Sequence, residues 1–211
     1  MTLCLVTVLN LGGGYKVGRM SYEYSTDILT VGEPVKNELE NFYQSTGRKL
    51  HLEIEPGTFL VANAGSLLST VQDIVSTKPL GHDFIKLDSG MTEVLRPSLY
   101  GAQHPIVVLK DSEETNDYII VGHCCESGDL FSCAPGEPEA LKERKLKTVE
   151  IGDLICIDGS GAYCAGMSTK NYNSFPEAPE VLLTKGGEVK LIRQRQSLDQ
   201  MLSNEMDYPS S

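Results

Sequence analysis

The chain has 211 residues and a net charge of −11, which is enough length for one large domain or two small ones with a hydrophobic core. The negative charge argues against nucleic acid and anionic membranes as partners, although a local site rich in backbone amides can still hold a phosphate. No apolar run approaches the length of a membrane-spanning helix, and six cysteines without framework spacing indicate free thiols, so we expect a cytoplasmic protein.

The first 62 residues have the pattern of an α/β unit. Residues 3–9 form a short apolar run, which predicts a buried parallel strand before a tight glycine turn. Apolar residues at helical spacing follow over residues 34–47, with the proline expected in the first turn and a glycine at the end. Residues 50–54 predict a second strand. Because the chain starts inside an expected core strand, we also expect an upstream segment to complete this unit.

From residue 63 to residue 195 the pattern becomes that of an all-β domain. Short apolar runs recur with turn residues between them, which is the spacing of an antiparallel barrel or sandwich. The runs lie at residues 66–75, 83–90, 105–110, 117–123, 148–159, 180–185 and 188–193. A polar insert at residues 135–147 predicts one helical turn, and residues 196–211 predict a helix followed by a disordered tail.

Polar clusters follow both strands expected in the first unit. Gly12, Gly13 and Gly14 allow backbone amides to approach a phosphate, but the triplet is neither a dinucleotide-binding fingerprint nor a P-loop, and a plain turn is the commoner interpretation. Glu55 begins a Glu-Pro-Gly turn at the corresponding strand end. Its carboxylate suits a protonated ring nitrogen, and the alternative is a solvent-exposed turn residue.

Later clusters carry a guanidinium, a thiol and two phenols. The guanidinium of Arg96 can bind a carboxylate with two parallel hydrogen bonds, and the hydroxyl of Tyr100 can add a third donor. The alternative is that Arg96 forms a surface ion pair and Tyr100 packs against the protein. Cys125 and Glu126 are a candidate acid and a candidate binding carboxylate, against the alternative of a half-buried free cysteine. Tyr163 is flanked by small residues and either faces a ligand or packs in the core.

A zinc site is the other interpretation of the cysteine cluster. His123, Cys124, Cys125 and Cys133 lie close together in the sequence. We reject zinc because no second ligand pair stands at finger spacing and the segment has the pattern of a strand. We therefore expect no metal.

Five motifs occur together in the order seen in diaminopimelate decarboxylases: LNLGGGYKVG, LEIEPGTFLVANAG, LDSGMTEVLRPSLYGAQH, VGHCCESGD and GDLICIDGSGAYCAGMSTKNYN. From about residue 8 to residue 185 the chain resembles this family, whose members use pyridoxal 5′-phosphate and share the fold of alanine racemase and ornithine decarboxylase. Glu126, where ornithine-type members have Asp, favours the diaminopimelate group. The resemblance implies the last part of a (β/α)₈ barrel at residues 1–62, a C-terminal β domain at 63–195, and a helix and tail at 196–211.

The resemblance also implies a cofactor site. The residues near the cofactor phosphate are Gly12, Gly13, Gly14, Gly57 and Tyr163. Glu55 pairs with the pyridine nitrogen, which keeps the ring protonated and makes it a better electron sink.

For the substrate, the resemblance implies that Arg96 and Tyr100 hold meso-diaminopimelate, with Arg96 on a carboxylate. Cys125 is the candidate proton donor and Glu126 holds the distal ammonium, both across the interface of a homodimer. The implied reaction yields L-lysine and carbon dioxide in lysine biosynthesis, in the cytoplasm or, in a plant-like source, in a plastid.

Two departures from the family pattern matter. Thr58 stands where many members have Arg, and the Schiff-base lysine and a ring-stacking histidine of the early barrel have no matching positions; Lys16 does not match that lysine. We therefore expect a fragment that is inactive alone. One alternative is a non-catalytic partner or regulator that docks on a full-length subunit. A third, an unrelated β-domain binding protein, requires all five motifs to be coincidental.

Overall fold

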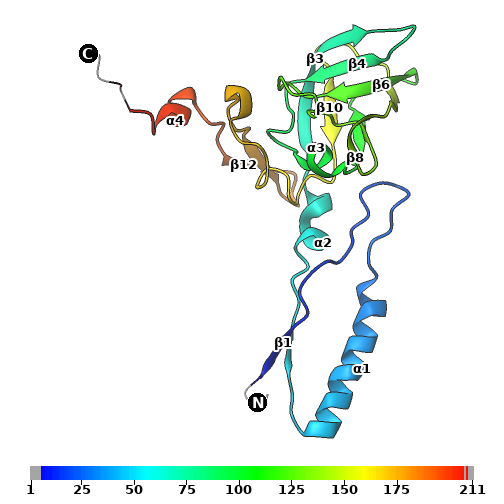
Figure 1. Ribbon diagram of the computed structural model, residues 1–211, viewed down its shortest axis with the longest axis vertical. Helices are drawn as coiled ribbons and strands as arrows, with labels where there is room; N and C mark the ends of the chain where they lie inside the picture. Colours follow the sequence, from blue (N-terminus) through cyan, green and yellow to red (C-terminus); the bar gives the residue numbers. More distant parts are fainter. Residues whose placement is uncertain (1–5, 207, 209–211) are drawn as a thin grey trace.

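The computed structural model describes residues 6–206 and residue 208, and Figure 1 shows an elongated α/β unit joined to a rounded sheet domain. In chain order the helices and strands are β1 (Val8–Asn10), α1 (Ile28–Thr46), β2 (His51–Glu53), α2 (Gly57–Val61), β3 (Leu67–Ser76), β4 (Asp83–Leu87), α3 (Arg96–Tyr100), β5 (Ile106–Val108), β6 (Thr115–Val121), β7 (Cys133–Ala134), β8 (Glu137–Leu141), β9 (Arg144–Lys147), β10 (Leu154–Ile157), β11 (Glu180–Leu183), β12 (Val189–Arg193) and α4 (Leu198–Leu202). Short 3₁₀ helices lie at Ala62–Ala64 and Tyr172–Ser174.

The α/β unit consists of two parallel strands, β1 and β2, joined by α1. Asp27 caps α1, because its carboxylate accepts hydrogen bonds from the amides of Leu29 and Thr30. Gly47 ends the helix in the left-handed conformation, with φ at 69°. The strand–helix–strand order predicted from the sequence is therefore confirmed.

Two details of this unit differ from the prediction. Pro34 lies inside α1 rather than in its first turn, because the cap at Asp27 starts the helix earlier. The described part of the first strand is exposed rather than buried, with Val8 42% and Leu9 36% exposed. No described segment covers this strand's outer face, and residues 3–5 of the predicted run lie outside the described residues.

The sheet domain is a nearly closed barrel of six strands in the order β5-β10-β3-β4-β6-β9. The end strands β5 and β9 lie against each other, which brings the two edges of the sheet together. The prediction of an antiparallel sheet is wrong at one point, because β4 and β6 pair in parallel. The chain between them contains α3 and β5, and this long crossover returns β6 in the direction of β4.

The core of the sheet domain fills the barrel interior with aliphatic side chains. Along β10, Ile155 and Ile157 are fully buried whereas Leu154 is 45% exposed, which is the alternation expected of a strand with one face in the core. The buried cluster includes Val71, Ile85, Leu87, Val108, Ile120, Phe131, Ile155 and Ile157. This core fixes the strand ends from which the loops of the candidate site extend.

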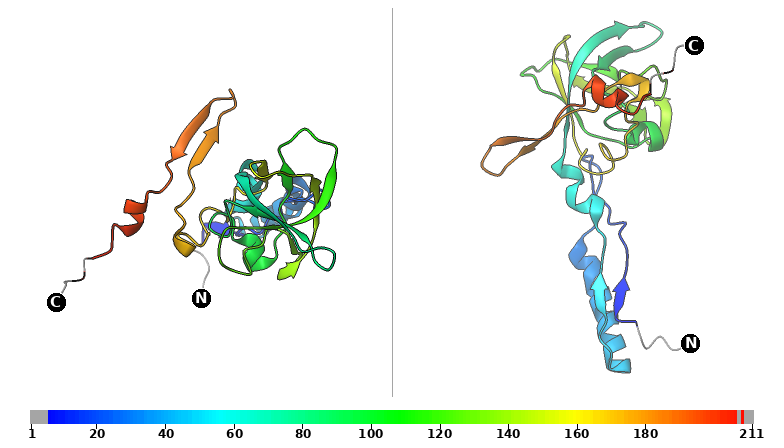
Figure 2. Two further views of the ribbon diagram at one scale, coloured as in Figure 1. Left: turned by 90° about the horizontal axis from the view of Figure 1, so that it is seen from above. Right: turned by 90° about the vertical axis from the view of Figure 1, so that its left-hand side faces the viewer.

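Two hairpins lie outside the six-stranded sheet. β7 pairs with β8, and β11 pairs with β12; Figure 2 shows the β11–β12 hairpin and α4 projecting from the domain. The helical turn predicted within residues 135–147 is wrong, since β8 alternates in exposure and pairs with β7, and β9 joins the barrel. The predicted C-terminal helix is confirmed as α4, which Ser197 and Gln200 cap reciprocally. No helix among the described residues is long and apolar enough to cross a membrane.

The long loop between β1 and α1 reaches the sheet domain (Figure 1). The Nε atom of Arg19 donates a 2.9 Å hydrogen bond to the carbonyl oxygen of Gly159, and Asn63 Nδ2 donates at 3.0 Å to the carbonyl oxygen of Gly18. These contacts hold the loop against the loops of the sheet domain and enclose the space described below.

Candidate functional site

One cavity of about 1040 Å³ is lined by residues of both the α/β unit and the sheet domain. The predicted site residues that line it are Gly13, Gly14, Glu55, Gly57, Arg96 and Tyr163. They come from four of the motifs identified in the sequence and lie far apart along the chain. The fold therefore brings most of the predicted site residues to one space.

The glycine triplet is a tight loop whose shape requires glycine. Gly12 and Gly14 have positive φ values of 71° and 85°, where a side chain would be strained. A Cβ atom on Gly13 would lie 2.4 Å from the carbonyl oxygen of Glu55. Gly13 and Gly14 line the cavity, whereas Gly12 does not. The loop is thus a tight turn that also forms part of the cavity wall, so the two alternatives left by the sequence, a plain turn and a phosphate-binding loop, do not exclude each other.

Asn10 fixes this loop against Glu55. Its Oδ1 atom accepts a 2.6 Å hydrogen bond from the amide of Gly12, and its Nδ2 atom donates a 2.8 Å hydrogen bond to Oε1 of Glu55. The amide of Glu55 in turn donates to the carbonyl oxygen of Gly12 at 2.8 Å. Asn10 was not predicted from the sequence, although an asparagine two residues before a glycine loop is a turn signal.

Two arginines bring positive charge to the cavity wall. Nη2 of Arg19 and Nε of Arg96 are buried and have no hydrogen-bond acceptor within the described residues. Burial, and then the charge of Arg96, lower the pKa of Arg19 below its usual value. Both arginines line the cavity, so this wall suits an anionic ligand.

Glu23 holds the backbone beside Arg19. Its Oε2 atom accepts hydrogen bonds from the amides of Arg19 at 2.8 Å and Met20 at 3.1 Å. Burial raises the pKa of Glu23, but these amide hydrogen bonds outweigh it, so the pKa lies below its usual value. Neither Arg19 nor Glu23 was predicted from the sequence, because neither stands in a recognisable motif.

The tyrosines predicted for the site differ in position. Tyr163 lines the cavity and has a positive φ of 55°, a backbone conformation that is uncommon outside glycine and often found at functional sites. Tyr100 does not line the cavity and is 54% exposed, but its ring lies under the guanidinium of Arg96, with 5.9 Å between the Arg96 carbon and the ring centroid.

Cys125 and Glu126 lie away from the cavity, in the exposed loop after β6. The amide of Cys125 donates a 2.7 Å hydrogen bond to Oδ1 of Asn173, and the hydroxyl of Tyr172 donates at 3.3 Å to Oε2 of Glu126. The chain therefore does not bring this pair to its own cavity.

The other groups considered from the sequence are placed as follows. Lys16 and Thr58 line the cavity, and the Lys16 backbone is held to Thr26 by two 2.8 Å hydrogen bonds. The five cysteines among the described residues are free thiols. Within the same residues, no group of three His, Cys, Asp or Glu side chains is arranged to hold a metal ion.

The sheet domain is that of a decarboxylase family. The family model for the C-terminal sheet domain of pyridoxal-dependent decarboxylases matches residues 20–161. The chain belongs to this family, as its motifs predicted.

Within this family, the chain is similar to diaminopimelate decarboxylases. Diaminopimelate decarboxylase of Buchnera aphidicola (subsp. Acyrthosiphon pisum) is 35% identical over 95% of this chain and 48% of its own length. The enzyme of Escherichia coli K12 is also 35% identical, over 94% of this chain and 47% of its own length. The chain thus spans about half the length of the curated relatives it matches.

Solved structures agree with this assignment. A crystal structure of a diaminopimelate decarboxylase superposes with a TM-score of 0.87 and 33% identity over 94% of this chain and 47% of that chain. The M. jannaschii diaminopimelate decarboxylase in complex with L-lysine gives a TM-score of 0.82 and 32% identity over 95% of this chain and 43% of that chain.

Proposed function

We propose that this chain is the C-terminal half of a diaminopimelate decarboxylase, which converts meso-diaminopimelate to L-lysine and carbon dioxide with pyridoxal 5′-phosphate. The observation that carries the proposal is the cavity shared by Gly13, Glu55, Arg96 and Tyr163, whose motifs are far apart in the sequence. The names of the relatives support the choice of substrate.

The cavity fits a cofactor with a phosphate group. Gly13 and Gly14 present backbone without side chains, and nothing lies within 4 Å of the Cβ position of Gly57. The guanidinium groups of Arg19 and Arg96, two residues that line the cavity, suit a phosphate and a carboxylate. We assign Gly12, Gly13, Gly14, Gly57 and Tyr163 to the phosphate end of the cofactor, with Gly12 acting through the shape of the loop.

Each remaining residue has one role in this proposal. When bound, pyridoxal phosphate accepts the electron pair left by the departing carboxylate. Glu55, held by Asn10, accepts a hydrogen bond from the protonated pyridine nitrogen. Arg96 binds a substrate carboxylate with its planar fork, and Tyr100 supports it.

Cys125 and Glu126 serve the cavity of a second subunit in a homodimer. Both are exposed in one chain and lie outside its own cavity, so they are available to a partner subunit. In the partner's site, Cys125 gives a proton to the substrate carbon and Glu126 binds the distal ammonium group.

The division of the chain follows from the same proposal. Residues 1–62 are the last part of a (β/α)₈ barrel, residues 63–195 form the β domain, and residues 196–211 form the terminal helix and tail. The lysine that anchors the cofactor lies in the other half of the protein, so this chain is inactive alone.

Reconstitution tests the proposed function. This chain is mixed with the N-terminal half of the Escherichia coli enzyme and pyridoxal phosphate, and carbon dioxide release is measured from meso-diaminopimelate and, separately, from ornithine. We expect release from meso-diaminopimelate only when both halves are present. Release by this chain alone contradicts the assigned need for the other half. A stable complex of the two halves without release favours the non-catalytic partner instead.

A further inference from the structure

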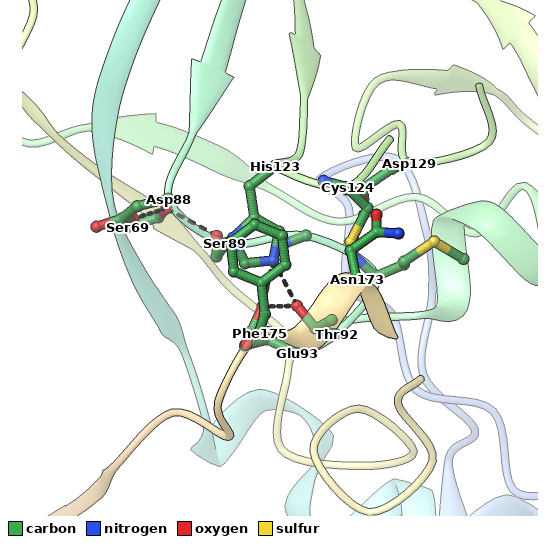
Figure 3. A network of polar contacts seen from close by, with 12 residues as sticks. Ser69, Asp88, Ser89, Thr92, Glu93, His123, Cys124, Asp129, Asn173 and Phe175 are labelled. Atoms are coloured by element: carbon green, nitrogen blue, oxygen red, sulfur yellow. Dashed lines mark hydrogen bonds and ion pairs between the residues drawn. The ribbon is translucent and has the colours of Figure 1, made fainter. Parts of the chain in front are cut away.

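Asp129 links two loops that carry different parts of the proposed site. Asp129 is almost fully buried, at 4% exposed. Oδ1 accepts a 2.7 Å hydrogen bond from the amide of Met91, and Oδ2 accepts a 2.8 Å hydrogen bond from the amide of Cys124. Figure 3 shows Asp129 beside Cys124 and Asn173. One carboxylate therefore joins the segment after β4 to the loop after β6.

Two glycines make room for this carboxylate. A Cβ atom on Gly90 would lie 2.4 Å from Oδ2 of Asp129, and one on Gly122 would lie 2.2 Å from the same atom. The loop also closes on itself, since the amide of Gly122 donates to the carbonyl oxygen of Asp129 at 2.9 Å. Side chains at either glycine would displace the carboxylate, so the two positions and Asp129 form one packed unit.

Each loop leads directly to residues of the proposed site. Met91 stands in the turn before α3, which begins at Arg96. The loop after β6 carries Cys125 and Glu126, the pair assigned to the partner subunit. A second link runs parallel to the first, because Oγ1 of Thr92 lies 2.7 Å from Nε2 of His123 (Figure 3).

We propose that Asp129 is a positioning residue that fixes the loop of Cys125 and Glu126 relative to the segment that places Arg96. It thereby couples the residues that serve the partner's cavity to the residues that serve the chain's own cavity. The structural link stands on the contacts above, and its consequence for catalysis rests on the proposed function.

Hydrogen exchange of the backbone amides tests the link in this chain without any assay of activity. Asp129→Asn keeps the size of the side chain but presents an amide nitrogen to one of the two donors. Gly122→Ala displaces the carboxylate without changing its charge. Asp153→Asn is the matched control for the first variant, because Asp153 accepts a 2.8 Å hydrogen bond from the amide of Glu150 in the turn before β10, outside both loops. Gly128→Ala is the control for the second, since its Cβ atom would be 3.7 Å from the nearest atom, Oε1 of Glu126.

We expect amides of residues 122–129 and of Met91 to exchange about tenfold faster in Asp129→Asn and Gly122→Ala, because a hydrogen bond to a charged group is lost. The two controls leave those amides unchanged. Unchanged exchange in both test variants, or equal acceleration of these amides in Asp153→Asn, overturns the proposal.

The reconstituted decarboxylase adds a readout that general destabilisation does not produce. We expect Asp129→Asn to lower kcat about tenfold while the affinity for pyridoxal phosphate stays unchanged, since the cofactor residues lie elsewhere. Equal losses in both quantities overturn the positioning role. If the wild-type halves do not turn over, the proposed function fails, and the exchange experiment still decides whether Asp129 links the loops.

Discussion

Nδ2 of Asn10 donates a 2.8 Å hydrogen bond to Oε1 of Glu55, at the point where the two parallel strands end. Asn10 also accepts a hydrogen bond from the amide of Gly12. The side-chain amide of Asn10 therefore positions two parts of the proposed site. These are the Glu55 carboxylate, proposed to face the pyridine nitrogen, and the glycine loop, proposed to face the phosphate.

Replacing Asn10 by aspartate tests this arrangement. The new carboxylate still accepts from the Gly12 amide but cannot donate to Glu55, and it repels that residue. We expect the kcat of the reconstituted enzyme to fall about tenfold or more, the effect of losing a hydrogen bond to a charged group. Asn116→Asp is the matched control, because Asn116 donates a 2.9 Å hydrogen bond to Asp83 outside the site. Equal losses in the two variants would contradict the role of Asn10.

Gly13 gives a second prediction, on the shape of the loop. In Gly13→Ala the Cβ atom meets the carbonyl oxygen of Glu55 at 2.4 Å, a backbone atom that cannot rotate away. We expect the free energy of unfolding to fall by about 1–3 kcal/mol, and the affinity for pyridoxal phosphate to fall with it. Urea denaturation and a cofactor titration measure the two effects. Gly186→Ala, with only Thr184 Oγ1 at 3.8 Å, is the control and should change neither.

His104 gives a prediction about pH. It is 1% exposed, and its Nδ1 atom lies 2.9 Å from the carbonyl oxygen of Asp158. Burial, together with the nearby charges of Arg19 and Arg96, lowers its pKa to about 4. The folded state therefore binds the proton less readily than the unfolded state, whose pKa is near 6.5. The contribution of neutral His104 to the free energy of unfolding is therefore fully present above pH 6.5. It is lost as the pH falls towards 4, which lowers the free energy of unfolding by about 3 kcal/mol.

The variant His104→Asn tests this dependence by urea denaturation at several pH values. Its unfolding free energy should be lower than that of the wild type at pH 7, and the difference should shrink as the pH falls to 4. His51→Asn, on the exposed strand β2, serves as control and should leave the wild-type pH dependence in place. A constant difference between wild type and His104→Asn over this range would contradict the assignment.

The strands of the sheet domain were predictable because apolar alternation with turn residues is a local signal. Only one end of α1 was predictable from the sequence. Gly47 correctly indicated where the helix ends, whereas Pro34 indicated a later start than the one that the Asp27 cap sets. The segment at residues 137–141 has helix-forming residues but lies in a strand, because pairing with β7 decides its conformation. The parallel pairing of β4 with β6 depends on a long crossover, so no pattern in the local sequence predicts it.

The residues of the candidate site were also predictable only where the local sequence carries a motif. Gly13, Glu55 and Arg96 stand in motifs and were found in the sequence, and the cavity gathers them. Glu23 was missed because its hydrogen bonds to the amides of Arg19 and Met20 follow no recognisable motif. Asn10 and Arg19 were missed because their importance comes from contacts across the chain. Arg19, for example, reaches Gly159 over a long sequence separation.

Mixing of subunits tests most directly the claim that one chain supplies residues to two active sites. Full-length dimers are prepared with Arg96→Ala in one pool and Cys125→Ser in the other, and each pool is expected to be nearly inactive. After random exchange, half of the dimers contain one subunit of each kind, and in each of these one of the two sites is intact. We expect roughly a quarter of the wild-type carbon dioxide release from meso-diaminopimelate. Mixed pools that stay as inactive as the separate pools, although mixed dimers have formed, would show that Arg96 and Cys125 act in the same subunit and would contradict this account.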